Sequence, residues 1–354
     1  MPCENCFADS WLKGHVRDHA TSRGKCPYCG SADSPRLKSA DISYLFQPLL
    51  GLYHELTSDT VDYGYENPLG ISDTLLNLVQ DDWDVFSGRL LEGGNAGKLL
   101  ENLANADWDD DSGENPLDAE ELYTRRPSVW HTSLESAFAG VVSEVSEDPD
   151  DEGIPAKLAE ALSEHFGRVA RAVSSGEHFF RGRPGGASPT TPYSGADIGA
   201  PPPGIASPGR ANPAGVSMLY VADVPETVVA ELRARSPQGP ISLCRVRTSR
   251  DVHVLDLVEG YPRINPFTES EETLFWEVEV ADLLILFGEE LAKPVHNDDD
   301  PQEYRTTQQL CAAVRDAGYD GIMYESTRRN GGVNLVLFDT ATGDILESWL
   351  KPAQ

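Results

Sequence analysis

The chain has 354 residues, of which 40% are hydrophobic, so it has room for two or three globular domains and at least one sizeable core. Its 58 acidic residues outnumber 28 lysines and arginines, and the formal net charge of −30 predicts repulsion from nucleic-acid backbones and from anionic membrane surfaces. No apolar run approaches the ~20 residues that a membrane-spanning helix needs, and the first residues lack the basic and apolar regions of a signal peptide. We therefore expect a cytoplasmic protein that binds neither nucleic acid nor membrane.

The composition along the chain predicts three domains, over 1–35, 36–175 and 176–354. The first range holds four of the six cysteines, the second is helical and acidic in pattern, and the third is rich in glycine, proline and short apolar runs. We therefore expect an α+β protein, in which a β-rich C-terminal domain follows a small cysteine-containing knuckle and an all-α domain.

The cysteines of the first range have the spacing of a metal site. They form two Cys-x2-Cys pairs with 19 residues between them, Cys3, Cys6, Cys26 and Cys29. Such a pair presents two thiolates to one metal at ~2.3 Å, and a reducing compartment favours metal ligands over disulfides. We predict a closed, structural Zn²⁺ site, with His15 or His19 as an alternative ligand. Cys244 in an alternating strand and Cys311 on an apolar helix face are predicted to be core residues.

Apolar residues at three- and four-residue intervals predict amphipathic helices in the middle range. These helices are expected over 42–56, 69–79, 96–106 and 155–173. Two acidic stretches, 107–121 and 145–153, lack the spaced, glycine-containing pattern of a calcium loop. We interpret both stretches as solvated loops.

In the C-terminal range, short β-branched and aromatic runs bounded by turn residues predict strands. The strands are expected over 177–183, 217–223, 241–247, 252–257, 274–280, 321–326 and 333–339, with helices over 226–235 and 306–318. The segment 184–215 is too rich in proline and glycine for regular structure, so it is either a functional lid or disordered.

The segment 209–233 is a glycine- and proline-rich loop with one arginine, then a strand with an aromatic residue, then a helix with a glutamate in its middle. On that helix, Glu231 lies three residues after Val228, beside the apolar stripe rather than opposite it. A carboxylate in this place needs a partner or a function, although a satisfied surface glutamate is the simpler alternative.

Three blocks of the C-terminal range resemble the RES family, which is named for its Arg, Glu and Ser and includes toxins of bacterial toxin–antitoxin pairs. The first block, Gly-Arg-x-Asn-Pro-x-Gly, holds Arg210. The second, Leu-Tyr followed by Thr-x-x-x-Glu, holds Tyr220 and Glu231, ten and eleven residues further along as the family pattern requires. The third, DGIMYESTRRNGGVNLVLF over 320–338, contains Ser326. The resemblance covers about 177–348, half of the chain.

The resemblance implies an α+β fold related to ADP-ribosyltransferase toxins such as diphtheria toxin, and cleavage of NAD at the nicotinamide–ribose bond. Because this cleavage develops positive charge on the ribose, we assign Glu231 to stabilise that charge and to hold a ribose hydroxyl. Tyr220 is expected to pack against nicotinamide, with a core strand tyrosine as the alternative. Arg210 is expected to bind the pyrophosphate through two parallel hydrogen bonds, with a solvent-exposed arginine as the alternative.

Three further residues are assigned to NAD through the resemblance. Ser326 is expected to reach phosphate or the nicotinamide ribose and not to act as a nucleophile, because no Gly-x-Ser-x-Gly elbow surrounds it. Arg181 and Arg183, which alternation places on one face of a strand, are the next expected dinucleotide contacts. The sequence has no convincing Gly-x-Gly-x-x-Gly loop, so NAD is expected to be a substrate and not a recycled cofactor.

Several interpretations of function stay open. An NAD glycohydrolase or phosphorylase that acts as a bacterial toxin or defence effector is the first. ADP-ribosyl transfer to a macromolecule uses the same site, and a zinc-stabilised interaction protein with an inactive RES-like domain is a third possibility. Family analogy implies a protein antitoxin of the Xre type, and long apolar helix faces are compatible with a homo-oligomer.

The N-terminal half resembles, more weakly, the HEPN-type helical domain found ahead of some RES domains. Members of the wider HEPN group include RNases with an Arg-x4–6-His motif. Two pairs fit that loose spacing, Arg126 with His131 and Arg171 with His178. RNase activity is therefore a minor alternative.

Overall fold

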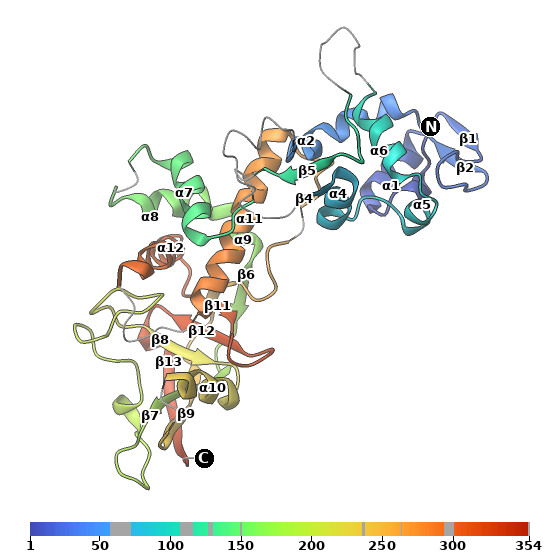
Figure 1. The fold of residues 1–354 in the computed structure, drawn as a ribbon. Coiled ribbons are helices and arrows are strands. Elements are labelled where there is room, and N and C mark those ends of the chain that lie inside the picture. The colour runs from blue at the N-terminus through green and yellow to red at the C-terminus, as the bar shows by residue number, and fades with distance from the viewer. Residues whose placement is uncertain are drawn as a thin grey trace. The chain divides into compact units, whose positions relative to one another are not determined.

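The computed structural model describes residues 1–56, 72–106, 116–126, 130–148, 151–235, 238–262, 264–293 and 301–352. The chain divides into two compact units, traced in Figure 1. Unit 1 comprises Met1–Thr132 and Arg263–Glu279, and unit 2 comprises Ser133–Pro262 and Val280–Gln354. Among the described residues, no helix has the length and apolar character needed to cross a membrane.

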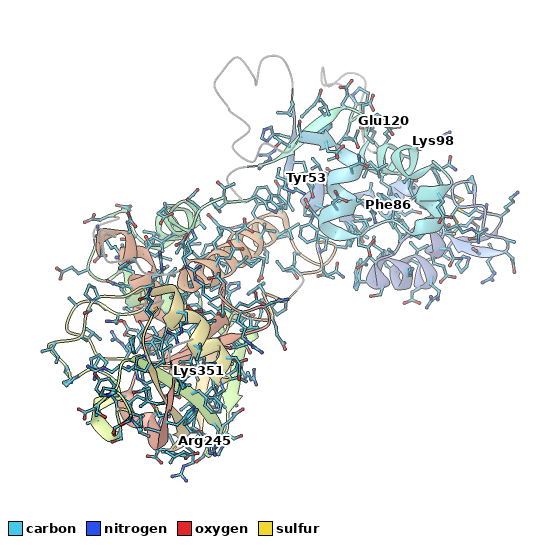
Figure 2. The ribbon with its side chains drawn as sticks, turned by 60° about the horizontal axis from the view of Figure 1, so that its bottom comes forward. Tyr53, Phe86, Lys98, Glu120, Arg245 and Lys351 are labelled. Atoms are coloured by element: carbon cyan, nitrogen blue, oxygen red, sulfur yellow. The ribbon has the colours of Figure 1, made fainter. Side chains whose placement is uncertain are left out.

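Unit 1 is built from short helices and two small antiparallel sheets. Its helices are η1 Glu4–Cys6, α1 Ser10–Asp18, η2 Ser39–Asp41, η3 Ser43–Leu45, α2 Gln47–Leu50, α4 Leu75–Trp83, α5 Gly88–Glu92 and α6 Ala96–Ala104. Its strands are β1 Ser22–Gly24 and β2 Ser34–Arg36 in one pair, and β3 Tyr53–Glu55, β5 Leu122–Arg125 and β4 Ser72–Thr74 in a second sheet. The rings of Phe7, Phe46 and Phe86 form the centre of the core, and Figure 2 shows Phe86 among the helices.

Unit 2 is organised around one large sheet. Its strands are β6 Ala170–Val173, β7 His178–Pro184, β8 Leu219–Ala222, β9 Ile241–Thr248, β10 Val252–Asp256, β11 Gly321–Glu325, β12 Val333–Leu337 and β13 Gly343–Lys351. Within the described residues their order is β13-β9-β7-β8-β12-β11-β10-β6, and every neighbouring pair is antiparallel except β10 with β11. The mixed sheet confirms the predicted α+β class.

The helices of unit 2 flank this sheet. They are α7 Leu134–Val145, α8 Ile154–Ala161, α9 Ser163–Arg168, η5 Gly195–Asp197, α10 Pro225–Arg235, η6 Pro301–Tyr304, α12 Arg305–Asp316 and η7 Thr340–Thr342, together with the C-terminal part of α11 Glu271–Ala292. Helix α10 packs on β7 and β8, while α12 packs against α7 and α8. Hydrophobic residues line both faces of the sheet, so the strands carry near-continuous apolar runs.

The predicted strand over 274–280 is wrong, because this segment lies in α11. The large apolar buried residues of α11 recur mostly at intervals of three or four, namely Leu274, Val278, Val280, Leu283, Leu284, Phe287 and Leu291. Over seven residues the alternation of Glu with apolar residues fits a strand as well, and the helical period becomes visible only when the run is followed to 291.

The middle range is less helical than expected. The predicted helix over 42–56 is interrupted, because the short α2 begins at Gln47 with Pro48 in its first turn and is capped by Gly51 before β3. The predicted helix over 155–173 is split into α8 and α9 and ends in β6, which pairs with β10. The helix expected over 96–106 is confirmed as α6.

Some expectations concern residues outside the described ranges. Of the helix expected over 69–79, the part from Leu75 is α4, capped by the Thr74 hydroxyl, and 69–71 are not described. The acidic loops expected over 107–121 and 145–153 lie outside the described residues at 107–115 and 149–150. The compact units also group residues differently from the three predicted domains, since 133–175 belong to unit 2.

Candidate functional site

A cavity of about 430 Å³ opens in unit 2 between α10, the strands beneath it and the loop 201–216. The polar residues in its wall include Arg210, Asn212, Tyr220, Glu231, Lys293, Tyr324 and Asn334. One row of paired residues crosses the sheet under it, running Tyr324, Asn334, Ala222 and Phe180 from β11 to β7. Because directly paired residues project to the same face, this row forms the floor of the cavity.

Glu231 projects into the cavity from α10. It lies between Val228 and Leu232, which pack on β7 and line the same cavity, so the predicted position beside the apolar stripe is confirmed. Gly182 of β7 makes this close packing possible, because a Cβ there would lie 2.6 Å from both Val228 Cγ1 and Leu232 Cδ1. The missing side chain lets α10 approach the sheet.

One oxygen of the Glu231 carboxylate is held by two uncharged donors. The Ser326 hydroxyl donates to Oε1 at 2.6 Å, and the Asn334 side-chain amide donates to the same atom at 3.1 Å. Both donors are buried, at 7% and 9% exposure. Within the described part of the chain, no hydrogen bond to Oε2 is found. The carboxylate is thus oriented through one oxygen while the other is free to contact a ligand.

Ser326 lies behind Glu231 and not in the cavity wall. It follows β11, and its backbone N–H donates to the Gly332 carbonyl at 2.8 Å, which closes the β11–β12 hairpin. Its hydroxyl also accepts from the Arg328 backbone N–H at 3.2 Å. The geometry gives Ser326 a contact with Glu231, and its expected contact with phosphate or ribose stays a prediction.

Tyr220 lies on β8 and is tied to the loop that carries Arg210. Its hydroxyl donates to Asn212 Oδ1 at 2.7 Å. The Asn212 amide in turn donates to the carbonyls of Ser207, Pro213 and Val216 at 2.9–3.1 Å. These bonds organise the loop from within, so the proline-rich segment is an ordered wall of the cavity.

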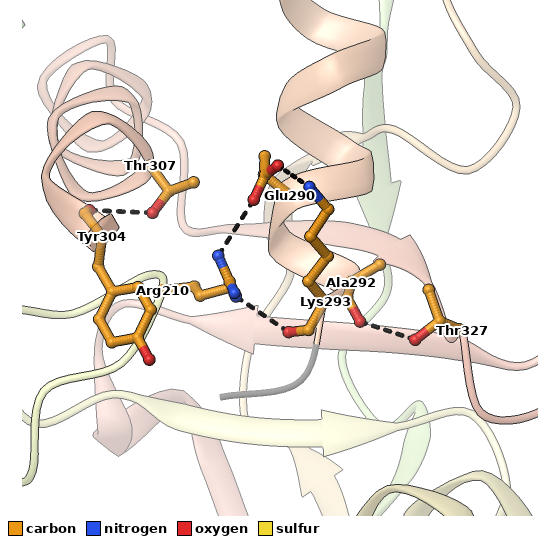
Figure 3. A network of polar contacts seen from close by, with 7 residues as sticks. All are labelled: Arg210, Glu290, Ala292, Lys293, Tyr304, Thr307 and Thr327. Carbon is orange, nitrogen blue, oxygen red and sulfur yellow. Dashed lines mark hydrogen bonds and ion pairs between the residues drawn. The ribbon is translucent and has the colours of Figure 1, made fainter. Parts of the chain in front are cut away.

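Arg210 also lines the cavity, and residues at the C-terminal end of α11 hold its guanidinium. Nε donates to the Lys293 carbonyl at 3.0 Å, Nη1 contacts Glu290 Oε2 at 3.1 Å, and the group lies 5.1 Å from the centre of the Tyr304 ring. Figure 3 shows this network at the end of α11. The structure thus brings Arg210, Tyr220 and Glu231 to one cavity from a loop, a strand and a helix.

This arrangement lies in the segment that matches a known family. Residues 179–349 match the model of the RES domain. This half of the chain is a RES domain. Among solved structures, a chain of the M. tuberculosis MbcT–MbcA toxin–antitoxin complex resembles the protein at 16% identity and a TM-score of 0.34, over 55% of this chain and 94% of that chain. No curated protein matched the sequence.

In the RES domain, Arg181 and Arg183 lie on the face of β7 opposite to Phe180 and Gly182. The Arg181 guanidinium donates to the carbonyls of Ile198, Gly199 and Tyr220 at 2.8–3.1 Å, and burial lowers its pKa. Arg183 contacts the Asp197 carbonyl and lies 4.6 Å over the Tyr193 ring. Both arginines therefore anchor the 193–199 segment, and Arg183 does not line the cavity.

Sequence reasoning missed four residues of the RES domain that hold the site together: Asn212, Glu290, Lys293 and Asn334. For two of them, the sequence contains a feature that points to a role in the site. Asn334 is a lone amide in an apolar strand, and Asn212 belongs to the Gly-Arg-x-Asn-Pro-x-Gly block. Glu290 and Lys293 sit in an ordinary charged helix end, where nothing local points to Arg210, some 80 residues earlier in the chain.

The four N-terminal cysteines lie outside the RES domain and form one buried cluster. Their sulfur atoms lie within 4.8 Å of one another, with contacts of 3.4 Å for Cys3 with Cys29, 3.5 Å for Cys6 with Cys26, and 4.0 Å for Cys3 with Cys6. Ligands at ~2.3 Å from a tetrahedral Zn²⁺ are about 3.8 Å apart, so the donor set fits this ion.

The local structure explains how the cysteines converge. Helix η1 turns the chain between Cys3 and Cys6, and Gly30, at a φ of 70°, donates to the Cys26 carbonyl to close the second turn. His15 and His19 instead stack on each other along α1, with ring centres 4.2 Å apart.

The remaining two cysteines are core residues, as predicted. Cys244 and Cys311 are 0% and 1% exposed. Burial raises the pKa of the Cys244 thiol to about 11 and raises that of Cys311 as well. Neither thiol is suited to act as a nucleophile or a ligand near neutral pH.

Proposed function

We propose that the RES domain cleaves the nicotinamide–ribose bond of NAD, with Glu231 as the central catalytic residue. The observation that carries this proposal is the Glu231 carboxylate in the cavity wall, tethered through Oε1 by Ser326 and Asn334 and with no hydrogen bond to Oε2 among the described residues. A fixed carboxylate suits a reaction whose transition state gains positive charge, because no reorganisation is needed as the charge develops.

The chemistry follows from the leaving group. The C–N bond to the pyridinium breaks with its electron pair moving to the ring nitrogen, and neutral nicotinamide leaves. The ribose carbon becomes oxocarbenium-like, and Glu231 stabilises it. Water or phosphate then bonds to that carbon, and a proton goes to solvent. Tyr220 offers an aromatic face for the nicotinamide, and Arg210 is assigned to the pyrophosphate.

The alternative transfer of ADP-ribose to a macromolecule uses the same first step and differs in the acceptor. No geometric feature of the described residues favours it over hydrolysis or phosphorolysis. Incubation with NAD labelled in its adenine half separates the outcomes: free ADP-ribose marks hydrolysis, ADP-ribose 1″-phosphate marks phosphorolysis, and label on a macromolecule marks transfer.

The central test compares Glu231→Gln with the parent in nicotinamide release. Loss of the charge is expected to lower kcat by about 100-fold or more, as for other residues that stabilise transition-state charge. Glu226→Gln is the matched control, because Glu226 lies exposed in the first turn of the same helix. Intact NAD after long incubation with folded parent protein would refute the activity, and release by Glu231→Gln at the parent rate would refute the site.

We further propose a biological setting and a cofactor. Depletion of NAD suits a cytoplasmic toxin or defence effector, and such an enzyme requires a protein antitoxin or another regulator in the cell that makes it. At the four N-terminal cysteines we propose a structural Zn²⁺, supported by the burial and spacing of the thiols.

A further inference from the structure

The C-terminal end of α11 gathers two cations at the cavity. The helix ends at Ala292, and its last carbonyls have no partner within the helix. The Ala292 carbonyl accepts from the Thr327 hydroxyl at 2.9 Å, and the Lys293 carbonyl accepts from Arg210 Nε at 3.0 Å. The negative end of a helix also favours nearby cations. Arg210 is thus bound to the end of α11 by geometry and by charge.

Glu290 connects both cations through its two carboxylate oxygens. Oε2 contacts Arg210 Nη1 at 3.1 Å, and Oε1 contacts Lys293 Nζ (Figure 3). The side chains of Arg210 and Glu290 are 12% and 18% exposed, so this pair is largely shielded from solvent. Without the shared carboxylate, two like charges would face each other beside the cavity.

The residues of this network differ in whether they line the cavity. Arg210 and Lys293 line the cavity, whereas Glu290 and Tyr304 contact Arg210 without lining it. Two of the five guanidinium N–H groups are used by the Lys293 carbonyl and Glu290. Among the described residues no other hydrogen bond from this guanidinium is found.

We propose that Glu290 is a positioning residue that holds Arg210 and Lys293 together as a binding pair for a diphosphate group. That this diphosphate group belongs to NAD rests on the proposed function. Lys293 is the second cation of the pair, and its side chain is 55% exposed, so it can follow an incoming anion while Arg210 stays fixed. A dianionic diphosphate matches two adjacent cations better than one.

The direction in which removal of Glu290 changes anion binding distinguishes a positioning role from a purely electrostatic one. A carboxylate beside an anion site weakens anion binding through repulsion, so removal of any nearby acidic group should tighten it. If Glu290 instead keeps the two cations in place, its removal weakens binding. The position of Glu290 behind the wall, with both oxygens on cations, favours the second effect.

The experiment measures binding of inorganic pyrophosphate to the full chain by calorimetry. Glu290→Ala is expected to weaken binding by about tenfold or more, and Lys293→Ala by roughly threefold to tenfold, in line with the loss of hydrogen bonds to charged groups. Glu290→Gln retains an acceptor oxygen for Arg210 and is expected to fall between Glu290→Ala and the parent. In NAD cleavage, KM should rise while kcat stays within about threefold.

Glu289→Ala is the matched control, because Glu289 is the exposed neighbour on the same helix and its loss changes the net charge equally. It should leave pyrophosphate binding unchanged or slightly tighter. Binding by Glu290→Ala as tight as that of the parent, or tighter, would overturn the proposal. If Glu290→Ala does not fold, unchanged binding by the exposed variant Lys293→Ala overturns it instead. Pyrophosphate binding does not depend on turnover, so a parent protein that binds pyrophosphate but leaves NAD intact contradicts only the proposed function.

Discussion

Glu231 is held by neutral donors on one side, which makes its orientation depend on hydrogen bonds and not on an ion pair. The two donors come from the β11–β12 hairpin, Ser326 after β11 and Asn334 within β12. A partner arginine would neutralise the charge that the proposed reaction uses, whereas hydroxyl and amide donors orient the carboxylate and leave that charge in place. We therefore predict that Glu231 acts on the substrate, while Ser326 and Asn334 position the Glu231 carboxylate.

Replacement of Ser326 by alanine tests this division. The variant loses the shorter of the two bonds to Glu231 and keeps the Asn334 bond. Because a hydrogen bond to a charged group contributes ~1.5–3 kcal/mol, kcat for NAD cleavage is expected to fall by about 10- to 100-fold while KM changes little. Steady-state kinetics of nicotinamide release provide the measurement.

Two variants serve as references for Ser326→Ala. Ser326→Thr retains a hydroxyl and should recover part of the lost kcat. Ser249→Ala removes an exposed hydroxyl that donates to the Ala341 carbonyl, away from the cavity lining, so parent kinetics are expected. A large rise in KM for Ser326→Ala, with kcat unchanged, would instead assign the hydroxyl to direct substrate binding.

At the scale of elements, the packing of α10 on β7 determines where Glu231 stands. The helix starts at Pro225 after Asp223, whose carboxylate accepts from the Val224 N–H at 2.8 Å and the Thr227 hydroxyl at 2.6 Å. Its inner face then meets the sheet at Gly182, where only a hydrogen fits under Val228 and Leu232. The height of α10 above the sheet therefore depends on one glycine.

The variant Gly182→Ala is expected to push α10 outward. A Cβ 2.6 Å from two packed side chains forces a shift, and overpacking of this kind costs about 1–3 kcal/mol. We expect a lower free energy of unfolding in denaturant titration and a lower kcat, because Glu231 moves with the helix. Gly167→Ala in α9 is the control, since no atom lies within 4 Å of its added Cβ and alanine favours a helix. Parent-like stability and kcat in Gly182→Ala would mean that α10 adapts without moving Glu231.

Across the whole molecule, unit 1 differs from unit 2 in that four clustered thiols are buried within its apolar core. Its helices and strands are short, and the cysteines belong to the same buried cluster as Phe7, Phe46 and Phe86. A metal there would link the first residues of the chain to the turn at Gly30. Structural Zn²⁺ contributes roughly 10–16 kcal/mol of apparent binding free energy to folding in small zinc domains.

Removal of the metal tests the proposed zinc site. The purified protein is expected to contain about one zinc per chain by elemental analysis. Chelation should lower the melting temperature of the transition that belongs to unit 1. Cys26→Ser should reduce zinc content, whereas Cys244→Ala, a core cysteine of unit 2, should not. Full zinc content in Cys26→Ser, or none in the parent, would contradict the assignment.

Features that depend on local pattern and spacing could be predicted from the amino-acid sequence. The blocks around Arg210, Tyr220, Glu231 and Ser326 indicated the RES family, and the match over 179–349 confirms it. Six of the strands expected in the C-terminal range are present, because their β-branched runs are bounded by turn residues. The Cys-x2-Cys spacing predicted that four thiols converge, and they do.

Contacts between side chains from distant segments became visible in the folded chain. The pairing of β12 with β8 and the packing of α10 on this sheet bring Asn334 and Glu231 together. The alternation of side chains along β7 places Arg183 on the face opposite to Gly182. The end of α11, which is distant in sequence, supplied Glu290 to Arg210. Local pattern reports the propensity of a segment and the face it buries, whereas these contacts depend on strand order and on helix packing between distant segments. The place of Glu231 beside the apolar stripe of its helix was therefore predictable, whereas its contact with Asn334 and the contact of Arg210 with Glu290 were not.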